Sequence, residues 1–116
     1  MPANTVLVVD DSPRDLQSLK NIVEDAGYQV YTASNGGEAI EKAKAFQPDI
    51  ILMDGADGFE TCRKITNDNI TNNIPVYFVT SKNQKADRVW GELQGGKGLI
   101  SKPYTPDQIL ETISSI

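Results

Sequence analysis

The feature of this sequence that most constrains its fold is a run of four large apolar residues that ends abruptly in a carboxylate. The run occupies residues 50–53; Pro48 and Asp49 precede it, and Asp54 and Gly55 follow it. Continuous apolar runs of this length, bounded by turn-forming residues, are typical of strands buried on both faces of a parallel sheet. In such sheets, ligands bind just beyond the carboxyl ends of the strands. The run therefore predicts a central strand with a candidate site at Asp54.

Four further β-rich segments alternate with amphipathic segments along the chain. The predicted strands are residues 6–9, 28–32, 50–54, 75–80 and 99–101, and the predicted helices are residues 13–26, 38–46, a segment that begins after residue 58, 86–94 and 106–116. Strands that alternate with helices form a parallel sheet with helices on both faces. The pattern predicts an α/β fold, a doubly wound five-stranded parallel sheet with five helices, in one domain that spans residues 1–116.

Local signals mark where several of these helices begin. Ser12 is placed to cap the first helix, Pro13 suits its first position, and Asp15 lies near its positive end. Residues 34–37, with the sequence SNGG, are predicted to form a turn. Thr105 and Gln108 have the spacing of a capping box at the last helix. Within residues 86–94, Val89, Trp90 and Leu93 fall at helical spacing and predict an apolar stripe on that helix.

Composition and charge exclude several classes of function. The chain has 116 residues, a net charge of −5 and no basic run, which argues against a nucleic-acid surface. It contains one cysteine and no histidine, which excludes an internal disulfide and any Ser-His or Cys-His catalytic scheme, and makes a zinc site unfavourable. We found neither a signal-peptide pattern nor an apolar run long enough to insert into a membrane. A cytoplasmic protein is therefore expected.

Polar residues follow four of the predicted strands and form one constellation. Asp10 and Asp11 end the first strand, Asp54 the third, Thr80 the fourth and Lys102 the fifth. Because the carboxyl ends of parallel strands meet at one edge of a sheet, these side chains are expected to lie together. Crowded carboxylates favour a cation, and Mg²⁺ prefers such oxygen ligands. An aspartate can act as a nucleophile, while an ammonium and a hydroxyl stabilise phosphoryl oxygens, so the set predicts phosphoryl transfer.

Five short motifs in the same order make the chain resemble a response-regulator receiver domain of the chemotaxis-receiver type over its whole length. The motifs are VVDDS at residues 8–12, DIILMD at 49–54, DGFE at 57–60, VTS at 79–81 and SKP at 101–103. The resemblance implies a flavodoxin-like fold with strand order 2-1-3-4-5.

The same resemblance implies roles for individual residues. Asp54 would be the phospho-acceptor, and Asp10, Asp11 and Asp54 would hold Mg²⁺ or Mn²⁺. Thr80 and Lys102 would bind the phosphoryl group. The bond between Lys102 and Pro103 would be cis.

The resemblance also implies the kind of signalling in which the chain takes part. The phosphoryl donor would be a histidine kinase, and the chain, without an effector domain, would act on a downstream protein through the face formed by residues 86–94, 99–101 and 106–116. No enzymatic activity beyond its own phosphorylation and dephosphorylation is expected. Residues 82–84, 87–91 and 94–95 give a narrower likeness to stand-alone receivers of chemotaxis-like systems that govern type IV pili, twitching and phototaxis.

Two departures from the family pattern bear on these expectations. Only Gly55 and Ala56 separate Asp54 from Asp57, where the family has a loop about four residues longer that contains Met-Pro. That loop supplies a backbone carbonyl to the metal, and Ala56 is the equivalent by position. The family's aromatic switch residue, three positions before the lysine, is replaced by Leu99.

Other interpretations of the same residues remain open at this point. Taken singly, Asp10 and Asp11 suit a helix cap, Thr80 a strand end and Cys62 a core position. A degenerate receiver that binds a protein constitutively, without phosphorylation, would explain the short loop. A phosphatase of the haloacid-dehalogenase kind would match Asp54 and Asp57 only loosely, because its two aspartates are two residues apart and lie near the N-terminus.

Overall fold

The computed structural model describes residues 4–81 and 85–116, and its central element is a five-stranded parallel sheet. The strands are β1 (Thr5–Val9), β2 (Gln29–Ala33), β3 (Ile50–Asp54), β4 (Val76–Thr80) and β5 (Gly98–Ser101), in the order β2-β1-β3-β4-β5. Both the predicted fold class and the order 2-1-3-4-5 are confirmed. The strand bounds differ from those predicted by one residue at most at each end.

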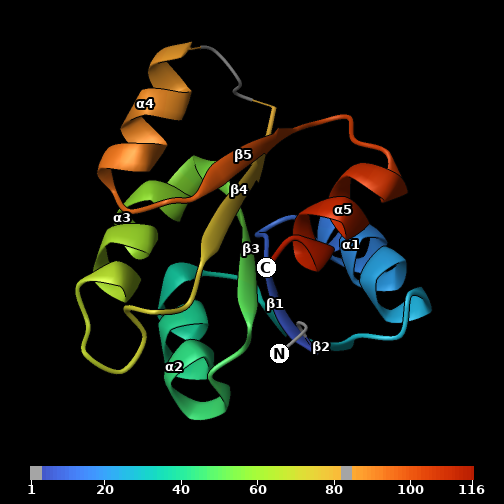
Figure 1. Cartoon of the computed structure of the whole chain (residues 1–116), viewed down its shortest axis with the longest axis horizontal. Helices are drawn as coiled ribbons and strands as arrows, with labels where there is room; N and C mark the ends of the chain where they lie inside the picture. Colours follow the sequence, from blue (N-terminus) through green and yellow to red (C-terminus); the bar gives the residue numbers. More distant parts are fainter. Residues whose placement is uncertain (1–3, 82–84) are drawn as a thin grey trace.

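Five helices cover the two faces of this sheet (Figure 1). They are α1 (Pro13–Asp25), α2 (Gly36–Phe46), α3 (Gly55–Thr66), α4 (Lys85–Leu93) and α5 (Pro106–Ser114). Helices α1 and α5 lie side by side on one face, and α2 and α3 lie on the other, with α4 beyond α3 toward the β5 edge (Figure 1). No helix in the described part of the chain combines the length and the apolar character needed to cross a bilayer.

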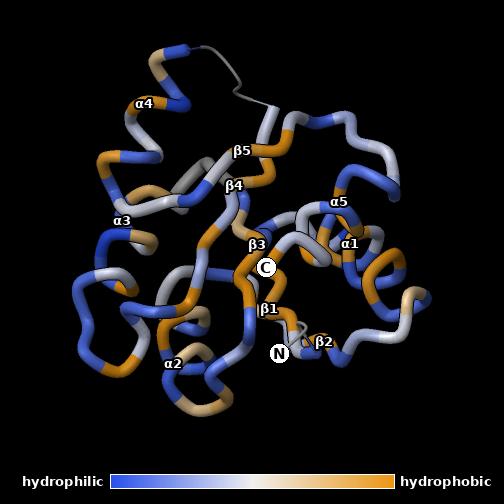
Figure 2. The backbone as a smooth tube through the Cα atoms, in the orientation of Figure 1, coloured by the Kyte–Doolittle hydropathy of each residue, from blue (hydrophilic) through white to orange (hydrophobic). Residues whose placement is uncertain are grey.

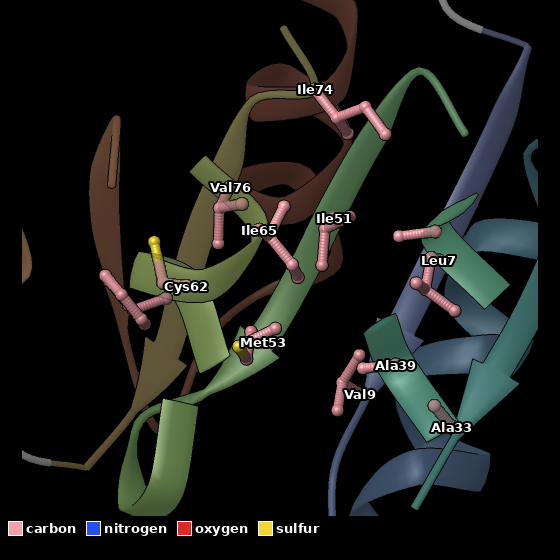
Figure 3. Packing of buried hydrophobic residues seen from close by; sticks show 12 residues of the cluster. Leu7, Val9, Ala33, Ala39, Ile51, Met53, Cys62, Ile65, Ile74 and Val76 are labelled. Carbon is pink, nitrogen blue, oxygen red and sulfur yellow. The ribbon is translucent and has the colours of Figure 1, made fainter. Parts of the chain in front are cut away.

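Alternation along the central strands divides the core into two clusters. Val6 and Val8 of β1 pack toward α1 and α5, whereas Leu7 and Val9 pack toward α2 and α3. The interior of the sheet is therefore apolar on both sides, as the hydropathy colouring of β1 and β3 indicates (Figure 2). In the cluster on the α2 and α3 face, Cys62 is fully buried among aliphatic side chains, which confirms its assignment to the core (Figure 3).

The local signals at the helix starts behave largely as predicted. The Ser12 side chain accepts a hydrogen bond from the backbone N–H of Asp15, and Thr105 and Gln108 form the capping box of α5. The predicted turn at residues 34–37 is wrong in part, because α2 already begins at Gly36. Asn35 is its N-cap, and Gly36 approaches Thr61 so closely that a Cβ atom there would collide with the Thr61 hydroxyl.

Helix α3 starts earlier than the sequence predicts. It begins at Gly55, directly after the last residue of β3, so that Asp54 ends the strand and is also the N-cap of the helix. Gly58 is buried in this helix, where a Cβ atom would lie 2.9 Å from Met53 Cγ. Strand and helix are thus joined without an intervening loop.

The apolar stripe predicted on α4 is solvent-exposed. Val89, Trp90 and Leu93 are 48%, 52% and 70% exposed, and Gly91 is the residue that faces the sheet. Gly91 fits there because a Cβ atom would lie 2.9 Å from the ring of Phe78. The helix presents its smallest residue to a bulky ring and its large apolar residues to solvent. Residues 82–84, which are part of the narrower motif, lie outside the described residues.

Candidate acidic phosphoryl site

The predicted site residues converge at the carboxyl ends of the strands. One carboxylate oxygen from each of Asp10, Asp11 and Asp54 lies within 4.8 Å of the others. The Lys102 ammonium lies 3.8 Å from Asp54 Oδ1. Thr80 ends β4 and is almost fully buried, and its carbonyl accepts a hydrogen bond of 2.9 Å from the Lys102 backbone N–H. The structure therefore brings the five side-chain positions to one edge of the sheet.

Strand alternation explains why three of these side chains reach the same side of that edge. Asp54 follows Leu52 by two residues and Lys102 follows Ile100 by two, and Leu52 and Ile100 both belong to the cluster packed against α1 and α5. Residues two apart in a strand point to the same face. Asp10 follows Val8 in the same way. The side chains of Asp10, Asp54 and Lys102 therefore point toward the start of α1.

Burial and hydrogen bonding differ among the three carboxylates. The Asp10 side chain is only 5% exposed, and its two oxygens have different partners: Oδ1 accepts from the Ser12 backbone N–H at 2.9 Å, and Oδ2 from Lys102 at 3.1 Å. Asp54 is 19% exposed, and Asp11 is exposed to solvent. A cation that binds between Asp11 and Asp54 can therefore be reached from solvent.

The Lys102 ammonium has an additional partner that the sequence analysis did not identify as a site residue. Asp15 Oδ2, from the first turn of α1, lies 3.1 Å from Lys102 Nζ. Burial acts to lower the pKa of Lys102, but hydrogen bonds to Asp10 and Asp15 and the Asp54 charge outweigh it, so the pKa is raised. In the sequence, the helix dipole alone explains an acidic residue such as Asp15 in a first helical turn. Nothing in the sequence therefore indicates its contact with Lys102.

A cavity of about 100 Å³ opens beside the carboxylates, between the starts of α2 and α3. Its lining combines site carboxylates with polar and apolar neighbours, namely Val9, Asp10, Asp11, Ser34, Asn35, Gly36, Met53, Asp54, Gly58 and Thr61. Asp54 is thus accessible to a small molecule from this side.

The donor set fits a small, hard cation. Three carboxylate oxygens close to one another repel unless positive charge lies among them, and Mg²⁺ takes oxygen ligands while it keeps several waters. Ala56 lies in the first turn of α3, directly after Asp54 and Gly55. The Ala56 carbonyl remains a predicted ligand, and the side-chain donors that the structure brings together are the carboxylates of Asp10, Asp11 and Asp54.

Two further expectations concern the residues around Lys102. The peptide bond between Lys102 and Pro103 is cis, as predicted. Leu99 is half-buried and packs against the α2 and α3 cluster. Tyr104 packs against the α1 and α5 cluster, and burial raises the pKa of its hydroxyl.

Comparisons with known proteins agree with this geometry. The model of the response regulator receiver domain family matches residues 6–114. Protein PilH of Pseudomonas aeruginosa is 40% identical over 115 residues, which cover 96% of this chain and 95% of that protein.

Two solved structures extend the comparison to the fold. The chemotaxis protein CheY4 of Vibrio cholerae superposes with a TM-score of 0.92 at 30% identity, and the match covers 98% of both chains. The receiver domain of the sensor histidine kinase PA1611 from Pseudomonas aeruginosa superposes with a TM-score of 0.89 at 22% identity, covering 97% of this chain and 96% of that one. That structure has a magnesium ion coordinated in its active-site cleft.

Proposed function

Because the chain belongs to the response regulator receiver domain family, we propose that it is a receiver that accepts a phosphoryl group from a histidine kinase on Asp54 in a Mg²⁺-dependent reaction. The observation that carries the proposal is the position of Asp54. It ends the central strand beside two further carboxylates, with an ammonium 3.8 Å from its Oδ1. A nucleophile, a site for a cation and a cationic side chain are the parts that phosphoryl transfer requires.

The residues divide the chemistry between them. An Asp54 carboxylate oxygen forms the new O–P bond while the P–N bond of the phosphohistidine breaks and its electron pair returns to the imidazole nitrogen. Asp10, Asp11 and Asp54 would hold Mg²⁺, which neutralises charge on the phosphoryl oxygens. Lys102 and the Thr80 hydroxyl bind two of those oxygens after transfer.

The output of this receiver would be a phosphorylation-dependent contact with a second protein. Phosphorylation replaces the single negative charge of the Asp54 carboxylate with about two on the phosphoryl oxygens, which draws Lys102 and Thr80 toward the new group. Lys102 follows β5 directly, so the change is transmitted to the face formed by α4, β5 and α5. Helix α4 carries the large apolar residues Val89, Trp90 and Leu93, which are exposed to solvent. The chain matches Protein PilH and has a narrower likeness to stand-alone receivers of type IV pilus systems. Both similarities support a role in pilus motility.

The test is phosphorylation by acetyl phosphate, with and without Mg²⁺, followed by intact mass measurement. The wild-type chain is expected to gain one phosphoryl group only when Mg²⁺ is present, and Asp54→Asn is expected to gain none. Asp25→Asn, which makes the same chemical change at the exposed end of α1, should be labelled like the wild type. Absence of labelling in the wild type under all conditions would favour the degenerate receiver that binds its partner constitutively.

A further inference from the structure

The ammonium of Lys102 lies closer to two other carboxylates than to the proposed acceptor. Its Nζ atom is 3.1 Å from Asp10 Oδ2 and 3.1 Å from Asp15 Oδ2, but 3.8 Å from Asp54 Oδ1. At 3.1 Å a charged group makes a hydrogen bond, whereas 3.8 Å leaves only the electrostatic attraction. Lys102 is therefore held beside Asp54 without being hydrogen-bonded to it.

The two residues that hold it are placed differently. Asp10 is almost fully buried, and its other oxygen accepts from a backbone N–H. Asp15 is 49% exposed and is not a member of the three-carboxylate cluster found among the described residues. Its position is set by α1, because the Ser12 hydroxyl accepts from its backbone N–H and the positive end of the helix favours a carboxylate there. Asp15 is thus fixed by the helix but is free of the cation site.

A phosphoryl group on Asp54 changes the balance of charge around the ammonium. Its oxygens attract Lys102 more strongly than a single carboxylate does. Asp10 keeps other partners when Lys102 moves, namely the Ser12 backbone N–H and, on the proposed function, the cation. Among the described residues, Lys102 is the cation that pairs with the Asp15 side chain, which is otherwise half exposed to solvent. The contact between Asp15 and Lys102 is therefore the one that competes with the phosphoryl group.

We propose that Asp15 is a positioning residue for phosphoryl transfer, one that holds the Lys102 ammonium off Asp54 in the unmodified protein and competes with the phosphoryl group for it afterwards. This inference rests on the proposed function of Asp54. It assigns Asp15 no contact with the phosphoryl donor. Asp15 sets how readily Lys102 reaches the phosphoryl oxygens. Removal of the Asp15 carboxylate therefore makes the contact between Lys102 and the phosphoryl oxygens more favourable.

The experiment measures the affinity of the full chain for beryllofluoride, a stable mimic of the phosphoryl group, by titration calorimetry at saturating Mg²⁺. Asp15→Asn is expected to bind beryllofluoride about two- to fivefold more tightly than the wild type, the range for losing a partly exposed ion pair. Asp15→Glu keeps the charge and should stay close to the wild type. Asp25→Asn removes the same charge from the other end of α1 and should have no effect.

A double-mutant cycle distinguishes the proposed contact from a general change in charge. In a Lys102→Met background, Asp15→Asn should no longer alter beryllofluoride affinity, because the competition acts only through the ammonium. An equal gain in both backgrounds, or no gain in the wild-type background, overturns the inference and leaves the proposed function intact. A wild-type chain that binds no beryllofluoride at all overturns the proposed function, and the inference with it.

Discussion

The two ends of strand β3 each have an aspartate, and the two residues are in opposite situations. Asp49 precedes the strand, and its Oδ2 accepts from the backbone N–H groups of Asn4 and Thr5 at 2.8 and 2.9 Å. These bonds, the Asn4 bond first, lower the pKa of Asp49. Asp54 ends the strand beside two other carboxylates, and the Lys102 ammonium lies 3.8 Å from its Oδ1. One carboxylate stabilises the fold, and the other is placed among groups that repel it.

The difference indicates where this fold gives up stability for chemistry. At the amino end, backbone donors meet a carboxylate and join the start of β1 to the start of β3. At the carboxyl end, the Lys102 ammonium lies near the carboxylates of Asp10, Asp15 and Asp54, and Asp11 lies beside Asp10 and Asp54. Such a cluster is unfavourable until a cation arrives, so its net negative charge is suited to binding one.

The largest expected effect contrasts the two aspartates directly. Asp54→Asn should abolish Mg²⁺-dependent labelling by acetyl phosphate, because the amide has no nucleophilic carboxylate. Asp49→Asn makes the same change five residues earlier and should still be labelled, since Asp49 lies at the opposite end of the strand. Intact mass after equal incubation checks both. Label retained on Asp54→Asn would refute the assignment of the acceptor and remove the contrast between the two ends.

The next effect separates the cation ligands from the ammonium. Asp11→Ala should weaken Mg²⁺ binding at least about tenfold, because one of three carboxylates is lost. Lys102→Ala removes a positive charge beside the carboxylates and should leave Mg²⁺ binding as strong or make it stronger. Titration calorimetry of both variants measures the difference. A loss of Mg²⁺ affinity in Lys102→Ala as large as that in Asp11→Ala would show that the division of roles is wrong.

Much of this carboxyl-end geometry could be predicted from sequence because it depends on strand ends. Continuous apolar runs locate β1 and β3, and the polar residue that follows such a run must lie at the edge of the sheet. Asp10, Asp54 and Lys102 were found in this way. The contact between Asp15 and Lys102 joins residues 87 positions apart and depends on the packing of α1 against the sheet. No local pattern contains that information.

Other differences likewise arise from contacts between elements that are distant in the sequence. The SNGG segment has the composition of a turn, yet Asn35 caps a helix that starts with its two glycines, since Gly36 packs where a larger residue would collide with Thr61. In α4, helical spacing predicted an apolar stripe but not its direction. The ring of Phe78 leaves room only for Gly91, and this turns Trp90 toward solvent.

A smaller effect concerns the stability that Asp49 contributes at the amino end of β3. Asp49→Asn should lower the free energy of unfolding by about 1 kcal/mol, a value reduced for its exposure, because the hydrogen bonds from Asn4 and Thr5 lose a charged acceptor. The pKa of Asp49 is lowered in the folded state, so its contribution is present above the ordinary carboxyl pKa and is lost as pH falls through the folded value. Urea unfolding at neutral pH and below pH 3 checks both statements. An equal difference between wild type and variant at the two pH values would contradict the role of the ionised carboxylate.

The smallest expected effect has opposite signs with and without Mg²⁺. Asp54 is the N-cap of α3 but makes no capping hydrogen bond with its side chain, and asparagine is an equally good cap residue. Without Mg²⁺, Asp54→Asn relieves repulsion from two carboxylates and weakens the attraction to Lys102 at 3.8 Å, so the variant should be more stable by about 0.5 kcal/mol. With Mg²⁺, the wild type gains stability from binding that the variant largely lacks, so the order should reverse. Thermal unfolding in chelator and in excess Mg²⁺ measures both orders. A variant less stable than the wild type in chelator would mean that Asp54 is held as favourably as Asp49, and the contrast between the two ends of β3 would not hold.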